Sequence, residues 1–383
     1  MVAAVETATS LRHTLHRFPE LSGHESETAG RVAEALAIGG IPTTRNLGGL
    51  HGLMCTIHGH KDGPCWALRA DMDALPIHEE RECAYTSTYP GVMHACGHDG
   101  HTATLVGVAL LLNQMRDQFS GSVRCLFQPA EETVSGAKSV IEGGGLEGVD
   151  YIVMSHGWPD LAVGTIGVRY GPAMASSDSF EILITGVGAH AAYPHMAKDP
   201  IFAGTSIVVA LQQLVSRNVN PVDSAVVSIT MFHAGTARNI IPGEAVLQGT
   251  LRTLKPGTRA LLMARLDEVV CSVASGCGVS AKVTWKIGTP PVLNNRCVVD
   301  RIASVASSSA VGASVQWLDE PTMGAEDFSH YLACVPGAML RLGTECPYHL
   351  HTPKYDFGDP ALAVGIRLLS EIAMSGGVPE LAR

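Results

Sequence analysis

The chain has 383 residues, of which 46% are hydrophobic and 16% charged, and its formal net charge is −10. This composition supports a large core and excludes global disorder. The negative charge argues against nucleic acid or an anionic membrane as a partner. Ten cysteines are scattered without a CxxC pair, which in so long a chain is not the pattern of a disulfide scaffold.

The N-terminus, Met1 to Glu6, lacks a basic region followed by an apolar segment, and no run of 18 apolar residues occurs. We therefore expect a cytoplasmic protein whose cysteines are mostly reduced and buried. For a chain of this length, two domains are the simplest expectation.

The first part of the chain is predicted to alternate helices with buried strands. Residues 7–18 and 25–38 carry apolar positions at helical spacing. Four apolar runs in the chain lead into ionisable side chains. These are Cys65–Leu68 before Asp71 and Asp73, Val123–Phe127 before Glu131 and Glu132, Tyr151–Met154 before His156, and Ala338–Leu342 before His349 and His351. Ligands of open α/β sheets bind at the carboxyl edge of the strands, so we expect these side chains to gather there.

The densest group of metal-binding side chain types is His94-Ala-Cys-Gly-His-Asp-Gly-His101. An apolar, helix-like run over residues 102–112 follows it directly. The free N–H groups of a helix N-terminus favour anions such as a thiolate. Cysteine and histidine at this density predict a transition metal site whose other ligands come from elsewhere in the chain.

The middle of the chain has a different pattern. Strands are predicted at 179–187, 225–232, 245–254 and 279–287, and helices at 199–215 and 258–274. The order β-α-β-β-α-β is that of a ferredoxin-like unit. We therefore expect an inserted α+β domain at 178–288 within an α/β domain formed by 1–177 and 289–383. Further helices are predicted at 298–310, after 324–328, and from Asp359-Pro360 onward.

Nine stretches, in order over nearly the whole chain, resemble the M20 family of metallopeptidases and amidohydrolases. The resemblance is closer to the branch with hippurate hydrolase and the plant auxin–amino acid conjugate hydrolases. It implies a zinc-peptidase-like catalytic domain with an inserted lid and dimerisation domain. The stretches are His16–Leu21, Arg69–Ile77, His94–His101, Phe127–Glu132, Gly188–His195, Ala237–Pro242, Gly249–Thr253, Met323–Phe328 and Leu350–Pro353.

The resemblance implies two divalent metal ions per subunit, and Mn²⁺, Zn²⁺ and Co²⁺ all remain open. Glu131 would be the general base. The implied ligands are Cys96, which would bridge the ions, His98, Glu132, His156 and His351. In the wider family a histidine ligand stands where this chain has Asp71, whereas the closer branch lacks it too. Asp73 is then expected to support a ligand, and the role of Asp71 stays open.

The inserted domain would also contribute to the site. By resemblance, His190 would stabilise the oxyanion in the partner subunit's active site, which implies a homodimer. Asn239 and Arg252 would bind the free carboxylate of the substrate, a task that suits the planar fork of arginine. Arg238 stands where this branch often has an apolar residue, and its role stays open.

The expected activity is metal-dependent hydrolysis of a small-molecule N-acyl amino acid to a carboxylic acid and a free amino acid. A dipeptidase, a carboxypeptidase or an N-acetyldiaminopimelate deacetylase would use the same machinery. A cysteine hydrolase with Cys96 as nucleophile and His98 or His101 as base is a different mechanism. A non-catalytic binding protein that retains the fold is the third class.

Overall fold

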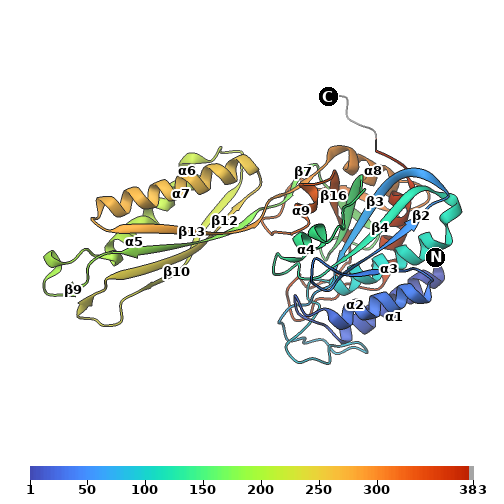
Figure 1. Ribbon diagram of the computed structural model, residues 1–383, viewed down its shortest axis with the longest axis horizontal. Coiled ribbons are helices and arrows are strands. Elements are labelled where there is room, and N and C mark those ends of the chain that lie inside the picture. The colour runs from blue at the N-terminus through green and yellow to red at the C-terminus, as the bar shows by residue number, and fades with distance from the viewer. Residues whose placement is uncertain (379–383) are drawn as a thin grey trace. The chain divides into compact units, whose positions relative to one another are not determined.

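The structure is a computed structural model that describes residues 1–378 and forms two compact units (Figure 1). The first unit contains Met1–Gly171, Leu293–Glu320 and the chain from Asp327 onward. The second contains Pro172–Val292 and the short segment Pro321–Glu326. The inclusion of this short segment in the second unit was not among the expectations from the sequence.

An eight-stranded sheet forms the centre of the first unit, in the order β1-β2-β4-β3-β5-β16-β6-β15. The four central strands β4, β3, β5 and β16 run parallel. On one side of them β2 is antiparallel to β4, and on the other β6 is antiparallel to β16 and parallel to β15. The carboxyl ends of the four parallel strands therefore share one edge. The strands are β1 (Thr44–Leu47), β2 (Gly52–His58), β3 (Lys61–Asp71), β4 (Ser120–Gln128), β5 (Tyr151–Trp158), β6 (Thr165–Val168), β15 (Ser314–Trp317) and β16 (Gly337–Gly343).

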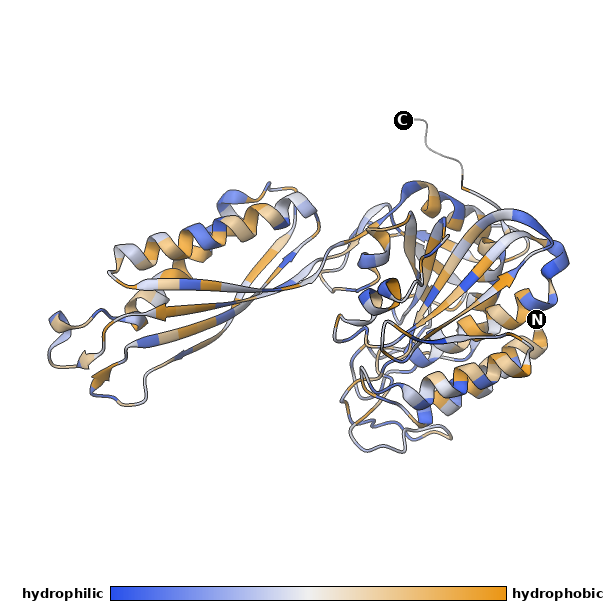
Figure 2. Ribbon diagram, in the orientation of Figure 1, coloured by the Kyte–Doolittle hydropathy of each residue, from blue (hydrophilic) through white to orange (hydrophobic). Residues whose placement is uncertain are grey.

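The core of this unit lies where helices pack on the sheet, and its central strands are rich in hydrophobic residues in Figure 2. The third helix is buried over most of its length because it contacts α1, α2, α10 and the sheet. Trp66 of the sheet and Val106 of this helix are both fully buried in the core of the first unit. The helices are α1 (Val2–Arg17), α2 (Ser26–Ile38), α3 (His98–Gln114), α4 (Gly136–Glu142), α8 (Arg296–Ala306), α9 (Ser329–Leu332) and α10 (Pro360–Met374), with a 3₁₀ turn η1 (Arg116–Gln118).

The second unit has a four-stranded antiparallel sheet in the order β10-β12-β8-β13, with helices packed on it. Burial alternates along β8 because one face meets the helices and the other does not. Its larger elements are β8 (Ser177–Thr185), α5 (Pro200–Leu211), α6 (Gln213–Asn218), β10 (Ala225–Ala234), β12 (Glu244–Thr253), α7 (Pro256–Gly276) and β13 (Ser280–Thr289). Its short elements are β9 (Ala189–His190), η2 (Pro194–Met196) and β11 (Ile240–Ile241), and β7 (Gly171–Met174) and β14 (Val292–Asn294) stand at its two ends in the chain.

Several predicted bounds differ from the observed ones. The helix predicted at 199–215 is divided at Gln212 into α5 and α6, and α8 ends at Ala306 instead of residue 310. The Asp199 carboxylate caps α5 by accepting hydrogen bonds from the amides of Ile201 and Phe202. No helix within residues 1–378 has both the length and the apolar composition needed to cross a bilayer.

Candidate metal centre

Six ionisable side chains from four segments gather at the carboxyl edge of the central strands. Cys96 and His98 come from the loop before α3 and its first residue, and Glu131 and Glu132 follow β4. His156 lies in β5, and His351 lies in the loop after β16. Donor atoms of Cys96, His98 and His156 lie within 4.8 Å of one another, as do those of Cys96, Glu132 and His351.

The two groups share Cys96. Its Sγ lies 3.6 Å from Nε2 of His156 and 3.3 Å from Nε2 of His351. Nε2 of His351 lies 3.3 Å from Oε1 of Glu132. Two overlapping groups with one common thiol have the arrangement that two neighbouring ions with a bridging ligand would need.

The histidines are oriented so that Nε2 of each faces the centre. Nδ1 of His98 lies 3.2 Å from Oδ1 of Asp73, and Nδ1 of His156 donates to the carbonyl of Gly157 at 2.8 Å. A hydrogen bond at Nδ1 fixes the tautomer and leaves the Nε2 lone pair available to a metal. Nε2 of His98 and Oε1 of Glu132 are buried without a hydrogen bond to the described residues, which fits a cation site.

Asp73 supports two of the proposed ligands at once. Besides facing His98, its Oδ2 accepts hydrogen bonds from the Glu132 amide at 3.0 Å and from the Ser22 hydroxyl at 2.6 Å. Burial alone would raise the pKa of Asp73, but the hydrogen bonds from these groups and the His98 charge lower it overall. These contacts agree with the expectation that Asp73 supports the ligands.

Asp71 faces a buried ion-pair network next to the centre. Its carboxylate lies 2.6 Å from Nη1 of Arg69 and 2.6 Å from Nδ1 of His101. Nη2 of Arg69 reaches Oδ1 of Asp327 at 2.9 Å, and Nε2 of His101 accepts from the Gly157 amide at 2.8 Å. A guanidinium in direct contact disfavours a metal ion on the same carboxylate, so Asp71 is better placed to hold His101 and the start of α3.

Two loops of the centre contain non-glycine residues with positive φ. Ala130 has φ 53° just before Glu131, and His351 has φ 61°. Side chains with a Cβ rarely adopt this region, and such strain clusters at functional sites. The Ala130 amide is held by the Glu25 carboxylate at 2.7 Å, and the His351 amide donates to the Ala95 carbonyl at 2.8 Å. Glu131 itself is buried and accepts a long hydrogen bond of 3.4 Å from the Asp327 amide.

The start of α3 is fixed by a second network that sequence reasoning missed. Arg12, fully buried in α1, binds Asp99 at 3.0 Å and also contacts Asp356 and Asp359. His16 lies 2.9 Å from the same Asp99 oxygen. Burial would lower the pKa of His16, but Asp99 and a further hydrogen bond raise it to about 9, so it stays charged at neutral pH.

Residues 67–375 match the peptidase family M20/M25/M40. The chain belongs to this family. A Bacillus subtilis (strain 168) protein named N-acetyl-L-cysteine deacetylase is 40% identical over 367 residues, covering 95% of this chain and 86% of its own. A Geobacillus stearothermophilus protein named N-acyl-L-amino acid amidohydrolase is 43% identical over 285 residues, covering 74% of this chain and 76% of its own. These similarities confirm the resemblance found in the sequence.

One solved M20 structure is close to this chain over almost its full length. It is a Bacillus subtilis protein described as a dinuclear metal binding peptidase, with 37% identity and a TM-score of 0.88. The alignment covers 98% of this chain and 99% of that one. A dinuclear relative supports the interpretation of the two overlapping ligand groups as a site for two ions.

The remaining predicted residues of this M20 chain lie in the second unit. His190 in β9 pairs with Ile240, and the Ala191 amide donates to the Asn239 carbonyl at 2.9 Å, so His190 and Asn239 are neighbours. Arg252 is near the far end of β12, where Nη1 donates to the Met323 carbonyl at 3.3 Å. Within this unit Arg252 is therefore separated from the other two. Arg238 is exposed.

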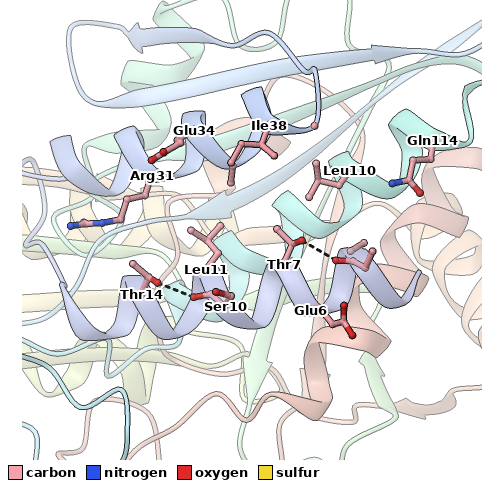
Figure 3. A pocket seen from close by; sticks show the side chains of 14 residues that line it. Glu6, Thr7, Ser10, Leu11, Thr14, Arg31, Glu34, Ile38, Leu110 and Gln114 are labelled. Atoms are coloured by element: carbon pink, nitrogen blue, oxygen red, sulfur yellow. Dashed lines mark hydrogen bonds between the residues drawn. The ribbon is translucent and has the colours of Figure 1, made fainter.

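A groove of about 610 Å³ between α1, α2 and α3 contains none of the predicted site residues (Figure 3). The hydroxyls of Thr7 and Thr14 along it donate to carbonyls one turn earlier in α1. Its charged lining is limited to Glu6, Arg31 and Glu34. The groove is not a candidate active site, because its lining contains no cluster of three potential metal ligands and no cysteine or histidine.

Proposed function

We propose that this M20 protein is a metal-dependent amidohydrolase that cleaves N-acyl amino acids to a carboxylic acid and a free amino acid. The observation that carries the proposal is the pair of ligand groups sharing Cys96, with the Glu131 carboxylate next to them. The relatives named as a deacetylase of N-acetyl-L-cysteine and an amidohydrolase of N-acyl-L-amino acids support this substrate class.

We assign the ligand roles to Cys96, His98, Glu132, His156 and His351, holding two divalent ions per subunit. When bound, such a pair lowers the pKa of water and polarises the amide carbonyl. Mn²⁺, Zn²⁺ and Co²⁺ all suit a mixed thiolate, imidazole and carboxylate set. Glu131 would accept the proton of the attacking water and transfer it to the leaving amine. Its neighbour Glu132 makes separate contacts, with Asp73 and His351, which is consistent with different roles for the two carboxylates.

We propose that the second unit is the inserted lid and dimerisation domain predicted at 178–288. His190 would stabilise the oxyanion of a partner subunit. Asn239 and Arg252 would bind the substrate carboxylate, and because they are separated within one unit, they would come from different subunits of the dimer. Exposed apolar side chains on α5 and the edge strand β10 support a homodimer, because such patches commonly mark interfaces. They are Ile201, Phe202, Val209, Met231 and Phe232. A monomer with full activity in light scattering at assay concentration would contradict the dimer.

The experiment that tests the activity measures release of free amino acid from N-acetyl, N-benzoyl and N-fatty-acyl amino acids and from dipeptides. Protein would be assayed as purified, after chelation, and after addition of Mn²⁺, Zn²⁺ or Co²⁺. We expect activity to disappear on chelation and to return with at least one metal. Dipeptides as the best substrates would favour the peptidase alternative, and N-acetyldiaminopimelate would be included for the deacetylase alternative.

Glu131→Gln separates the metal mechanism from a cysteine hydrolase. We expect the variant to bind metal normally and to lose at least about 100-fold in kcat, because the general base is removed. The matched control is Glu34→Gln, a change at an exposed glutamate of α2. An active Glu131→Gln variant that is insensitive to chelation and inactivated by thiol alkylation would assign the chemistry to Cys96.

A further inference from the structure

One arginine of the first unit lies next to the candidate metal centre and stands apart from the mechanism described above. Arg341 of β16 is directly opposite His156 in the register of β16 and β5. Its guanidinium carbon lies 3.8 Å from the ring centroid of Trp158. The Trp158 ring in turn lies 6.1 Å from the His156 ring. The guanidinium therefore stacks on an indole ring that is itself near a proposed metal ligand.

The two fully buried arginines among residues 1–378 have carboxylate partners, whereas the half-buried Arg124 and Arg301 donate to backbone carbonyls. Arg12 binds Asp99, and Arg69 binds both Asp71 and Asp327. Half-buried Arg341 forms no ion pair with a carboxylate of residues 1–378, and Asp160, the one carboxylate whose charge acts on it, pairs with His349 at 3.7 Å. A guanidinium that is partly removed from water without a counter-ion is a favourable partner for an incoming anion.

The electrostatics around Arg341 agree with this. Burial, and then the like charge of Arg169, lower the pKa of Arg341 to about 10, whereas Asp160 opposes the shift. Arg341 therefore remains charged at neutral pH in a locally positive environment. Because the indole covers one face of the guanidinium, the N–H groups along its edge stay free to bind a carboxylate through two hydrogen bonds.

We propose that Arg341, stacked on Trp158, is an anion-binding subsite that accepts a second carboxylate of the substrate. The inference rests on the proposed amidohydrolase function and narrows its substrate class to N-acyl amino acids with two carboxylates. The first carboxylate is the one assigned to Asn239 and Arg252. The second can belong to the amino acid side chain, as in an N-acyl glutamate, or to a dicarboxylic acyl group, as in an N-succinyl amino acid.

The test compares kcat/KM for substrate pairs that differ in one charge. N-acetyl-L-glutamate against N-acetyl-L-glutamine examines the side chain, and N-succinylglycine against N-butanoylglycine examines the acyl group. We expect the native protein to prefer the charged member of one pair. Arg341→Met should reduce that preference about 10- to 100-fold, through a lower kcat/KM for the charged substrate alone. Arg341→Lys should retain part of the preference, because it keeps the charge without the fork. The control is Arg116→Met, at an exposed arginine.

Calorimetric binding of the products to the metal-loaded protein gives a readout without turnover. L-glutamate would be compared with L-glutamine, and succinate with butanoate, in the native protein and in Arg341→Met. Normal turnover of neutral substrates without discrimination in either assay would overturn the subsite and leave the proposed function intact. Absence of all turnover, with Arg341-dependent binding of the dicarboxylates L-glutamate or succinate, would overturn the function and retain the subsite.

Discussion

Replacement of Arg12 by Met is the sharpest stability test that the structure offers. The side chain is completely buried, and its guanidinium contacts Asp99, Asp356 and Asp359. Methionine fills a similar volume and removes the charge. The carboxylates then differ in how readily water can replace the lost partner, because the Asp356 and Asp359 side chains are 22% and 35% exposed, whereas Asp99 is 1% exposed.

The magnitude follows from Asp99. Removing one partner of a buried ion pair costs about 3–5 kcal/mol, because the remaining charge is left in a poor solvent. His16 still contacts Asp99 at 2.9 Å, which moderates the loss, so we expect about 3 kcal/mol. Asp99→Asn in the Arg12→Met background removes the stranded charge and should recover part of this loss.

The assay is urea unfolding of the native protein, Arg12→Met, the double variant and the control Arg116→Met, all at neutral pH. The control should change the free energy of unfolding by less than about 0.5 kcal/mol, because Arg116 is exposed. A loss below about 1 kcal/mol for Arg12→Met, or a double variant less stable than the single one, would refute the reasoning.

Two further predictions concern pH and packing. Burial raises the pKa of Glu25 to about 7, against 4.5 for an ordinary glutamate, so the folded state binds more protons between these values. The contribution of Glu25 to the free energy of unfolding should therefore fall by about 3 kcal/mol from pH 4.5 to pH 7. Urea titrations measure it as the difference between the native protein and Glu25→Gln, and a difference that does not change with pH would contradict the prediction. Gly100→Ala places a Cβ 2.2 Å from the Phe357 ring, so it should reduce the free energy of unfolding by about 1–3 kcal/mol and lower Tm. The Cβ of Gly257→Ala meets nothing within 4 Å, so this variant should keep the native Tm. Equal melting curves for the two alanine variants would contradict the packing argument.

The position of the candidate centre was predictable because the strands that supply it are continuous apolar runs. Such a run marks a strand buried on both faces, and a buried strand in an α/β sheet is usually parallel. The side chains after β3, β4 and β5 were thus expected at one edge, and Glu132 and His156 do lie there, in two groups that share Cys96 of the loop before α3. Edge strands such as β1 and β15 are mostly exposed, so they lack this pattern and escaped prediction.

The supporting networks were beyond the reach of sequence reasoning. Arg12 and Asp99 are 87 residues apart, and Arg69 and Asp327 are 258 apart. No periodicity links positions at such separations, since their contact depends on the packing of whole elements. Each member taken alone reads as an ordinary charged residue. Arg341 escaped for the same reason, because only the register of β16 with β5 places it beside His156.

The thiol common to both ligand groups has a consequence for the conditions under which such a protein can work. Oxidation of a cysteine to a sulfinic or sulfonic acid replaces the sulfur donor irreversibly in most proteins. Because Cys96 belongs to both groups, a single oxidation event would remove a ligand from both proposed ions at once. Low exposure, at 7% for Cys96, limits the approach of oxidants. Inactivation by peroxide is expected to be slow for this reason, and to occur in one step with loss of both metals together, because the two groups share Cys96.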